Sequence, residues 1–216
     1  GHFALQNQNV TDGAATYNTA VGYNAGNDIT TGVQNTLIGG LAGDALTTAV
    51  NNIAIGYKAL TADTLGRKNV AIGVGALEDQ NFTTSTDSYN VAIGDNAGAN
   101  VTTGIQNTLI GGLAGDALTT GSYNNAFGYV SLSTATTGEQ NAAFGRYSLN
   151  ANTSGSENTA VGNHALNSNT TADNNTAVGY QSLYANTSAI GNTAVGFASG
   201  YTNTTGTDNV SLGYNA

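Results

Sequence analysis

The residues of this chain that could perform chemistry are few and scattered. His2 and His164 are the only histidines, and there is no cysteine, so neither a thiolate nucleophile nor a cysteine-ligated metal is available. Asp44 and Asp63 could act as a carboxylate pair only if they stacked on neighbouring structural layers. The glycine-rich segment 39–43 lacks the lysine of a phosphate-binding loop. The sequence therefore predicts no enzyme, no metal and no cofactor.

Charge excludes further classes of partner. The net charge is −9, with only four lysines and arginines in 216 residues, so no basic stripe can meet the phosphates of a nucleic acid. No run of 18 apolar residues occurs, and we expect no membrane insertion. Because the chain starts at Gly1 rather than Met, we expect it to be processed or cut from a longer protein. Absence of cysteine is compatible with an extracellular, cell-surface or virion protein.

A five-residue motif recurs along the chain and must set the positions of any functional side chains. It reads Asn, any residue, a small residue, a bulky apolar residue, Gly, and it occurs twelve times. Ten of the eleven steps between motif glycines have the same length, and only the step from Gly73 to Gly94 is longer. A fixed period this short, about 17 residues, predicts a solenoid, in which each repeat buries its apolar face only against the next. The motif glycines are Gly22, Gly39, Gly56, Gly73, Gly94, Gly111, Gly128, Gly145, Gly162, Gly179, Gly196 and Gly213.

The repeat unit is too short for two helices and a turn, and glycine in every repeat would cost a helix roughly 1 kcal/mol each time. The bulky positions are β-branched or aromatic, which suits a strand. We therefore expect an all-β parallel solenoid of about twelve coils, each with two short strands and two bends. Residues 18–216 form one array. Residues 1–17 form a degenerate first coil, whose Phe3 and Leu5 could cover the first layer.

The recurring columns of the repeat suggest structural roles. The bulky column is expected to stack inside as an apolar spine, and the asparagines are expected to bond coil to coil and satisfy backbone groups at a bend. The small column would then face outward and suit close packing against another copy of the rod. The alternative is a wide monomeric coil with a flat exposed alanine face. The expected ladder comprises Asn18, Asn35, Asn52, Asn69, Asn90, Asn107, Asn124, Asn141, Asn158, Asn175, Asn192 and Asn209.

The longer step, from Gly73 to Gly94, contains the only insertion, within 78–89. Insertions in a solenoid bulge out as loops on one side, so an acidic loop with aromatic residues is the leading candidate for partner binding. Tolerated sequence drift is the alternative. The candidate contact residues are Glu78, Asp79, Phe82, Asp87 and Tyr89.

Two further columns have alternative interpretations. Aromatic residues that directly follow several motif glycines could stack on sugars or protein partners, or could belong to the spine or an interface. They are Tyr23, Tyr57, Tyr129, Tyr180, Phe197 and Tyr214. A threonine stands eight residues after most motif glycines, as at Thr30 and Thr170. It could form an ice-binding face, or hydroxyl ladders at a bend.

The motifs N-N-I-A-I-G at 51–56, N-V-A-I-G at 69–73 and 90–94, and N-T-A-V-G at 158–162 resemble the head repeats of trimeric autotransporter adhesins. Similar arrays occur in bacteriophage tail fibres. The resemblance implies a left-handed β-roll, a homotrimer, and attachment to a host surface glycan or protein. We therefore expect a structural and adhesive fibre module. A subunit of a self-stacking extracellular filament is the alternative, and an ice-binding solenoid is a third.

Overall fold

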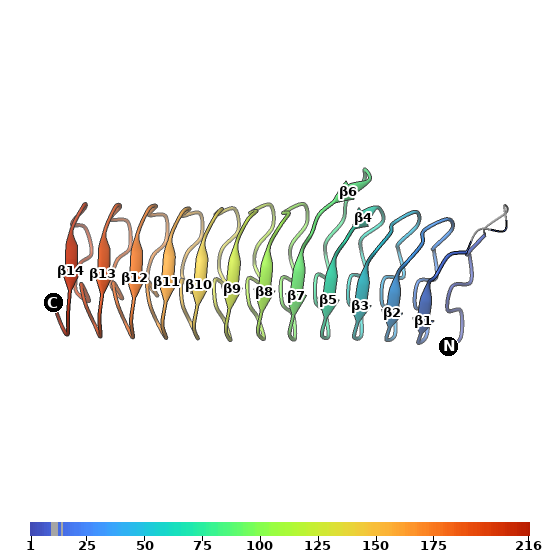
Figure 1. Cartoon of the computed structure of the whole chain (residues 1–216), viewed down its shortest axis with the longest axis horizontal. Coiled ribbons are helices and arrows are strands. Elements are labelled where there is room, and N and C mark those ends of the chain that lie inside the picture. Colours follow the sequence, from blue (N-terminus) through green and yellow to red (C-terminus); the bar gives the residue numbers. More distant parts are fainter. Residues whose placement is uncertain (10–12, 14) are drawn as a thin grey trace.

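The computed structural model describes residues 1–9, 13 and 15–216 as a long rod of stacked coils (Figure 1). Each coil contributes one three-residue strand, and two shorter strands lie beside the insertion. The strands are β1 Thr19–Val21, β2 Thr36–Ile38, β3 Ile53–Ile55, β4 Gly66–Arg67, β5 Val70–Ile72, β6 Thr86–Asp87, β7 Val91–Ile93, β8 Thr108–Ile110, β9 Asn125–Phe127, β10 Ala142–Phe144, β11 Thr159–Val161, β12 Thr176–Val178, β13 Thr193–Val195 and β14 Val210–Leu212.

The motif strands form one 12-stranded parallel sheet that follows chain order, while β4 and β6 pair separately. Each strand pairs with the same motif positions of the next coil, as where Ala160 faces Ala177. The predicted parallel β-solenoid is confirmed, with about eleven turns and no helix among the described residues. None of those residues therefore forms a helix that could span a membrane.

The prediction of two strands per regular coil is wrong. After its strand, each coil continues through turns and bends, because several residues adopt left-handed conformations that an extended strand cannot accommodate. These residues include Leu60, with φ of 54°, and Leu132, with φ of 52°. A narrow coil with tight corners replaces the expected pair of opposed strands.

The motif glycine is required for two reasons. At Gly111, φ is 132°, a conformation that residues with a side chain rarely adopt. A β-carbon at this position would also lie 2.5 Å from the carbonyl oxygen of Gly128 in the next coil. The close approach of successive backbones predicted from the sequence is therefore present.

The orientation predicted for the strand is reversed. The small column points inward, as Ala71, Ala92 and Ala160 are all fully buried. The bulky column points outward, so that Val21 is 55% and Val161 38% exposed. The interior is narrow and is already filled by apolar side chains from the turn. The inward strand position therefore holds alanine or leucine in every coil but the last, which has Ser211, and the larger β-branched and aromatic residues face outward.

The core of each coil is filled mainly from one of two positions, four or seven residues after the motif glycine. Leu132 and Leu149 fill the interior from the fourth position, opposite Ala135 and Asn152 at the seventh. Where the fourth residue is glycine, as at Gly115, the seventh is apolar, except in coil 11, where Gly200 is followed by Asn203. A β-carbon on Gly115 would lie 3.0 Å from the Leu118 side chain and 2.8 Å from that of Leu109, so each coil has room for only one of the two arrangements.

The N-terminal segment covers the first coil only in part. The amide of Leu5 donates to the carbonyl of Ala25, and Leu5 packs against the core. Phe3, expected to help, is 41% exposed and lies against His2 and Tyr23 instead. Part of the predicted degenerate coil, residues 10–12 and 14, lies outside the described residues.

Candidate functional site

The asparagine column forms a hydrogen-bond ladder on the inside of the rod. In the regular coils each amide oxygen accepts the backbone N–H of the next ladder asparagine, as from Asn124 to Asn107 at 3.0 Å. The side-chain NH₂ of Asn124 donates to the carbonyl of Gly138, at 2.9 Å. Apart from the end residues Asn18 and Asn209, the ladder asparagines are at most 1% exposed. The column thus satisfies backbone groups at the bend, and it offers nothing to an external ligand.

The ladder continues past the insertion, where further buried polar residues join it. The four extra residues, 83–86, lie on the same edge of the rod as β4, where β6 projects beyond the neighbouring coils (Figure 1). Asn69 therefore accepts from the Ser88 hydroxyl at 2.8 Å as well as from the amide of Asn90. The NH₂ of Asn90 donates to Gln80 at 2.8 Å. The loop is built into the rod by specific contacts.

Asp63 lies at the centre of these polar residues and is fully buried. Its carboxylate accepts hydrogen bonds from Gln80 at 2.7 Å and from the backbone N–H groups of Gly66 and Phe82, at 3.0 and 3.1 Å. Burial raises the pKa of Asp63 above 3.8, and these donors partly oppose that rise. Asp44 accepts instead from the Thr61 hydroxyl, so the suggested carboxylate pair binds two different sets of partners.

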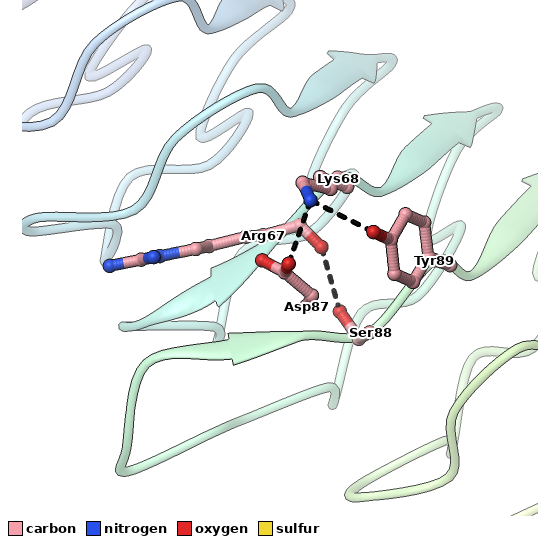
Figure 2. Close-up of polar contacts among 5 residues, drawn as sticks. All are labelled: Arg67, Lys68, Asp87, Ser88 and Tyr89. Atoms are coloured by element: carbon pink, nitrogen blue, oxygen red, sulfur yellow. Dashed lines mark hydrogen bonds and ion pairs between the residues drawn. The ribbon is translucent and has the colours of Figure 1, made fainter.

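Two lysines hold the insertion from opposite sides. Lys68 donates to Asp87 at 2.7 Å and to the Tyr89 hydroxyl at 2.8 Å, and the Ser88 hydroxyl donates to the carbonyl of Arg67 (Figure 2). Lys58 pairs with Glu78 at 2.8 Å. These partners raise the pKa of both lysines. Solvent-screened pairs of this kind contribute little to stability, but they fix the position of the loop.

The predicted contact residues therefore separate into two groups. Phe82 is only 6% exposed, so little of its ring is accessible at the surface. Its backbone turns inward to donate to Asp63, and its ring becomes part of the interior. Glu78, Asp87 and Tyr89 are bound to lysines. Asp79 is exposed, together with Thr83, Thr84 and Ser85 at the tip. The accessible surface of the insertion is thus richer in hydroxyl groups than expected.

Sequence reasoning missed the bridging role of Asp63 and Gln80, and it missed the contacts that Lys58 and Lys68 make with the insertion. A signal was available for the first two, because both place a polar group in a column that holds Ile29, Leu46 or Val101 in other coils. Metal binding finds no support in the described part of the chain, where no group of three or more His, Asp or Glu side chains converges.

The threonine column is engaged within the rod. Thr102, Thr119 and Thr153 each donate a hydroxyl hydrogen bond to the backbone carbonyl of the corresponding threonine one coil on, at 2.9–3.1 Å. The hydroxyl hydrogens of these threonines join successive coils, which agrees with the ladder interpretation of this column.

The aromatic residues after the motif glycines are exposed and form stacks. Tyr180 and Phe197 are 44% and 45% exposed, with ring centroids 5.2 Å apart. Tyr57 and Tyr129 are also exposed, so this column belongs to the surface. Comparison with known proteins adds no assignment: no family model, curated protein or solved structure matches the chain.

Proposed function

We propose that this chain is a structural and adhesive fibre module, a rigid shaft or head that self-associates and attaches to a host or other surface outside the cell. The observation that carries the proposal is the uncharged outer face of the 12-stranded sheet. Its two outward columns hold Val, Ile, Leu, Phe, Thr, Ala or Asn in all twelve coils, without one charged residue.

The apolar residues on this face do not serve solubility. Every coil places a bulky apolar residue in this row. Val21, Ile38, Phe144, Val161, Val195 and Leu212 are exposed, and the residues of the other coils are half-buried. Eleven steps of ~4.8 Å make the row about 50 Å long. Apolar strips of this extent in soluble proteins are typical of interaction surfaces. The correction of strand orientation therefore moves the expected interface from the alanine column to the bulky column.

A second copy of the same chain fits this face best. A partner that buries the row must present apolar groups at the same axial step over many layers, and another copy does so coil by coil. Closed homo-oligomers are the common outcome of such self-complementary surfaces. We expect three parallel copies, as the resemblance to adhesin heads suggests.

Light scattering on the purified chain tests the assembly. We expect a mass three times the 21.6 kDa of one chain. Ile55→Asp with Ile110→Asp should give monomers, because a buried carboxylate on the face would lack a partner. Thr103→Asp with Thr137→Asp adds the same charge at exposed positions away from the sheet and should leave the mass unchanged. A monomeric wild type would overturn the assembly, and fibrils would favour the filament alternative.

Disulfide formation tests the orientation, because the chain has no cysteine of its own. Val161→Cys should cross-link to itself in parallel copies that align coil with coil. Thr137→Cys is the control and should stay reduced. In an antiparallel arrangement Val161→Cys would not form the disulfide.

Attachment can be tested separately through the insertion. Deleting residues 83–86 restores the regular step between motif glycines and removes the exposed tip. We expect this variant to keep the mass of the wild type and to lose binding to fixed cells that the wild type decorates. Failure of the wild type to bind any cell surface tested would leave a structural shaft and remove the adhesive role.

A further inference from the structure

Eight ring side chains form a continuous strip on the C-terminal half of the rod. They come from coils 7–12 and lie on the turn that follows each strand, along the lower edge of the rod in Figure 1. Neighbouring ring centroids lie 5.1–6.5 Å apart. We call these residues the aromatic strip: Tyr129, Tyr147, His164, Tyr180, Tyr184, Phe197, Tyr201 and Tyr214.

The fold does not require rings at these positions. The columns that hold Tyr180 and Tyr184 in coil 10 hold Gly40 and Asp44 in coil 2, and Gly112 and Asp116 in coil 6. The backbone repeats with the same register in all these coils. The concentration of rings in one half of the rod therefore has no role in forming the coils and is a feature of the surface there.

The rings leave surface available for a ligand. Tyr184 and Tyr201 are nearly parallel, at 4°, with centroids 5.1 Å apart. This separation exceeds the thickness of a ring, so the rings overlap only partly, in the offset manner that aromatic pairs prefer. Tyr201 is 38% exposed and Tyr184 is half-buried, so part of each side chain is open to solvent.

The strip is free of negative charge although the chain carries −9. The four acids of coils 7–12, Glu139, Glu157, Asp173 and Asp208, all stand one or two residues before a ladder asparagine, on a different part of the coil. Arg146, with its guanidinium 4.5 Å from the Tyr147 ring centroid, is the one cation beside the strip. The exposed amide of Asn163 and the half-buried amide of Gln181 lie between the rings. Such a surface fits a neutral ligand with many hydroxyl groups.

We propose that the aromatic strip binds an extended, neutral, β-1,4-linked polysaccharide along the rod axis. Coils repeat every ~4.8 Å, and an extended chain of this linkage advances by nearly one coil spacing per sugar. Successive sugars can therefore meet equivalent rings at Tyr180, Phe197 and Tyr214 in coils 10–12. An extended peptide advances by about 3.3 Å per residue and falls out of step. This inference rests on the proposed adhesive function and names the class of ligand.

Isothermal titration of the intact chain tests this assignment with three hexasaccharides. Cellohexaose and chitohexaose are extended, and we expect at least one of them to bind saturably. Maltohexaose carries α-linkages that curve the chain, so we expect binding at least tenfold weaker. No saturable binding of either extended hexasaccharide, or equal binding of maltohexaose, would overturn the proposal.

A variant built from the chain's own repeats tests the location. Tyr184→Asn with Tyr201→Asn installs the residue that coils 8 and 9 carry in this column, at Asn150 and Asn167. We expect at least a tenfold loss of affinity with unchanged thermal unfolding. Tyr123→Gln removes an exposed tyrosine outside the strip and should bind within twofold of the wild type. Wild-type affinity in the double variant would refute the assignment.

The outcomes also separate this inference from the proposed function. Cell attachment without hexasaccharide binding would remove the aromatic strip as a glycan site and leave the adhesive module in place. Hexasaccharide binding by a chain that attaches to no cell surface would support the strip and count against the adhesive role.

Discussion

Each motif glycine is constrained both by its own backbone conformation and by the coil above it. A comparison of Gly111 with its neighbour Gly112 separates these two constraints from the general effect of replacing a glycine. Gly111 combines a φ of 132° with a close approach to Gly128, whereas a β-carbon on Gly112 would meet only the Tyr129 ring at 3.5 Å.

We predict that Gly111→Ala lowers the free energy of unfolding by about 3 kcal/mol, because strain and a backbone clash add. Gly112→Ala should change it by less than about 0.5 kcal/mol. Urea unfolding followed by circular dichroism measures both. Equal effects in the two variants would mean that the contact between coils does not explain the motif glycine.

Asp63 carries a second prediction at the scale of one residue. Asparagine already occupies this column at Asn152 and Asn169, so Asp63→Asn is compatible with the interior and removes a buried charge. We expect it to raise the free energy of unfolding at pH 7 by about 1 kcal/mol.

The direction of the pKa shift determines how the stability difference between the two chains changes with pH. Burial raises the pKa of Asp63 in the folded chain above its unfolded value of 3.8. Its stabilising contribution is therefore complete below pH 3.8 and is lost as the pH rises through the folded pKa. The advantage of Asp63→Asn should be smallest near pH 3 and should grow toward pH 7. A difference that does not change with pH would show that charge burial is not the cause.

At the scale of one coil, the interior behaves as a shared volume. Coil 7 fills it with Leu132 and Ala135, whereas coil 5 uses Gly98 and Val101 around the same inward alanine. We therefore expect one arrangement to replace the other only when both residues are changed together.

We predict that Leu132→Gly alone costs about 4 kcal/mol, through a cavity and the flexibility of glycine. Ala135→Val alone should cost about 1–3 kcal/mol by overpacking. The double variant recreates coil 5 and should recover most of the loss, giving a coupling energy above about 1 kcal/mol in a double-mutant cycle. Simple additivity would indicate that the two columns do not share space.

The period of the motif was sufficient to predict the parallel register and the ladder of asparagines, but not the single strand of each regular coil. It could not predict which face of the strand lies inside, because two neighbouring positions, such as Ala71 and Ile72, are both apolar and a shift of one residue exchanges the faces. The deciding information lies outside the motif, in Leu77 and its equivalents, which fill the interior from a turn. Phe82 was misplaced for a related reason: its burial depends on a hydrogen bond to Asp63, which lies in the preceding coil.

At the scale of the whole molecule, the rod is a one-dimensional stack whose stability is a sum over coils and the contacts between them. Its repeat length is therefore a strict constraint, while the number of repeats is not. The insertion of residues 83–86 agrees with this, because it leaves the register of β5 with β7 intact and is accommodated outside the sheet.

This constraint predicts different results from two nearly identical deletions. Removal of residues 141–157 joins Gln140 to Asn158 and deletes one complete coil, so every column stays in register. We expect a folded rod with nearly unchanged unfolding midpoint, since one contact between coils is lost from many. Removal of only residues 141–156 leaves one extra residue, which must bulge outward or turn the apolar strand positions to the wrong face. Circular dichroism and urea unfolding should show the second variant at least about 2 kcal/mol less stable than the first, and equal stabilities would contradict a solenoid held together by coil register.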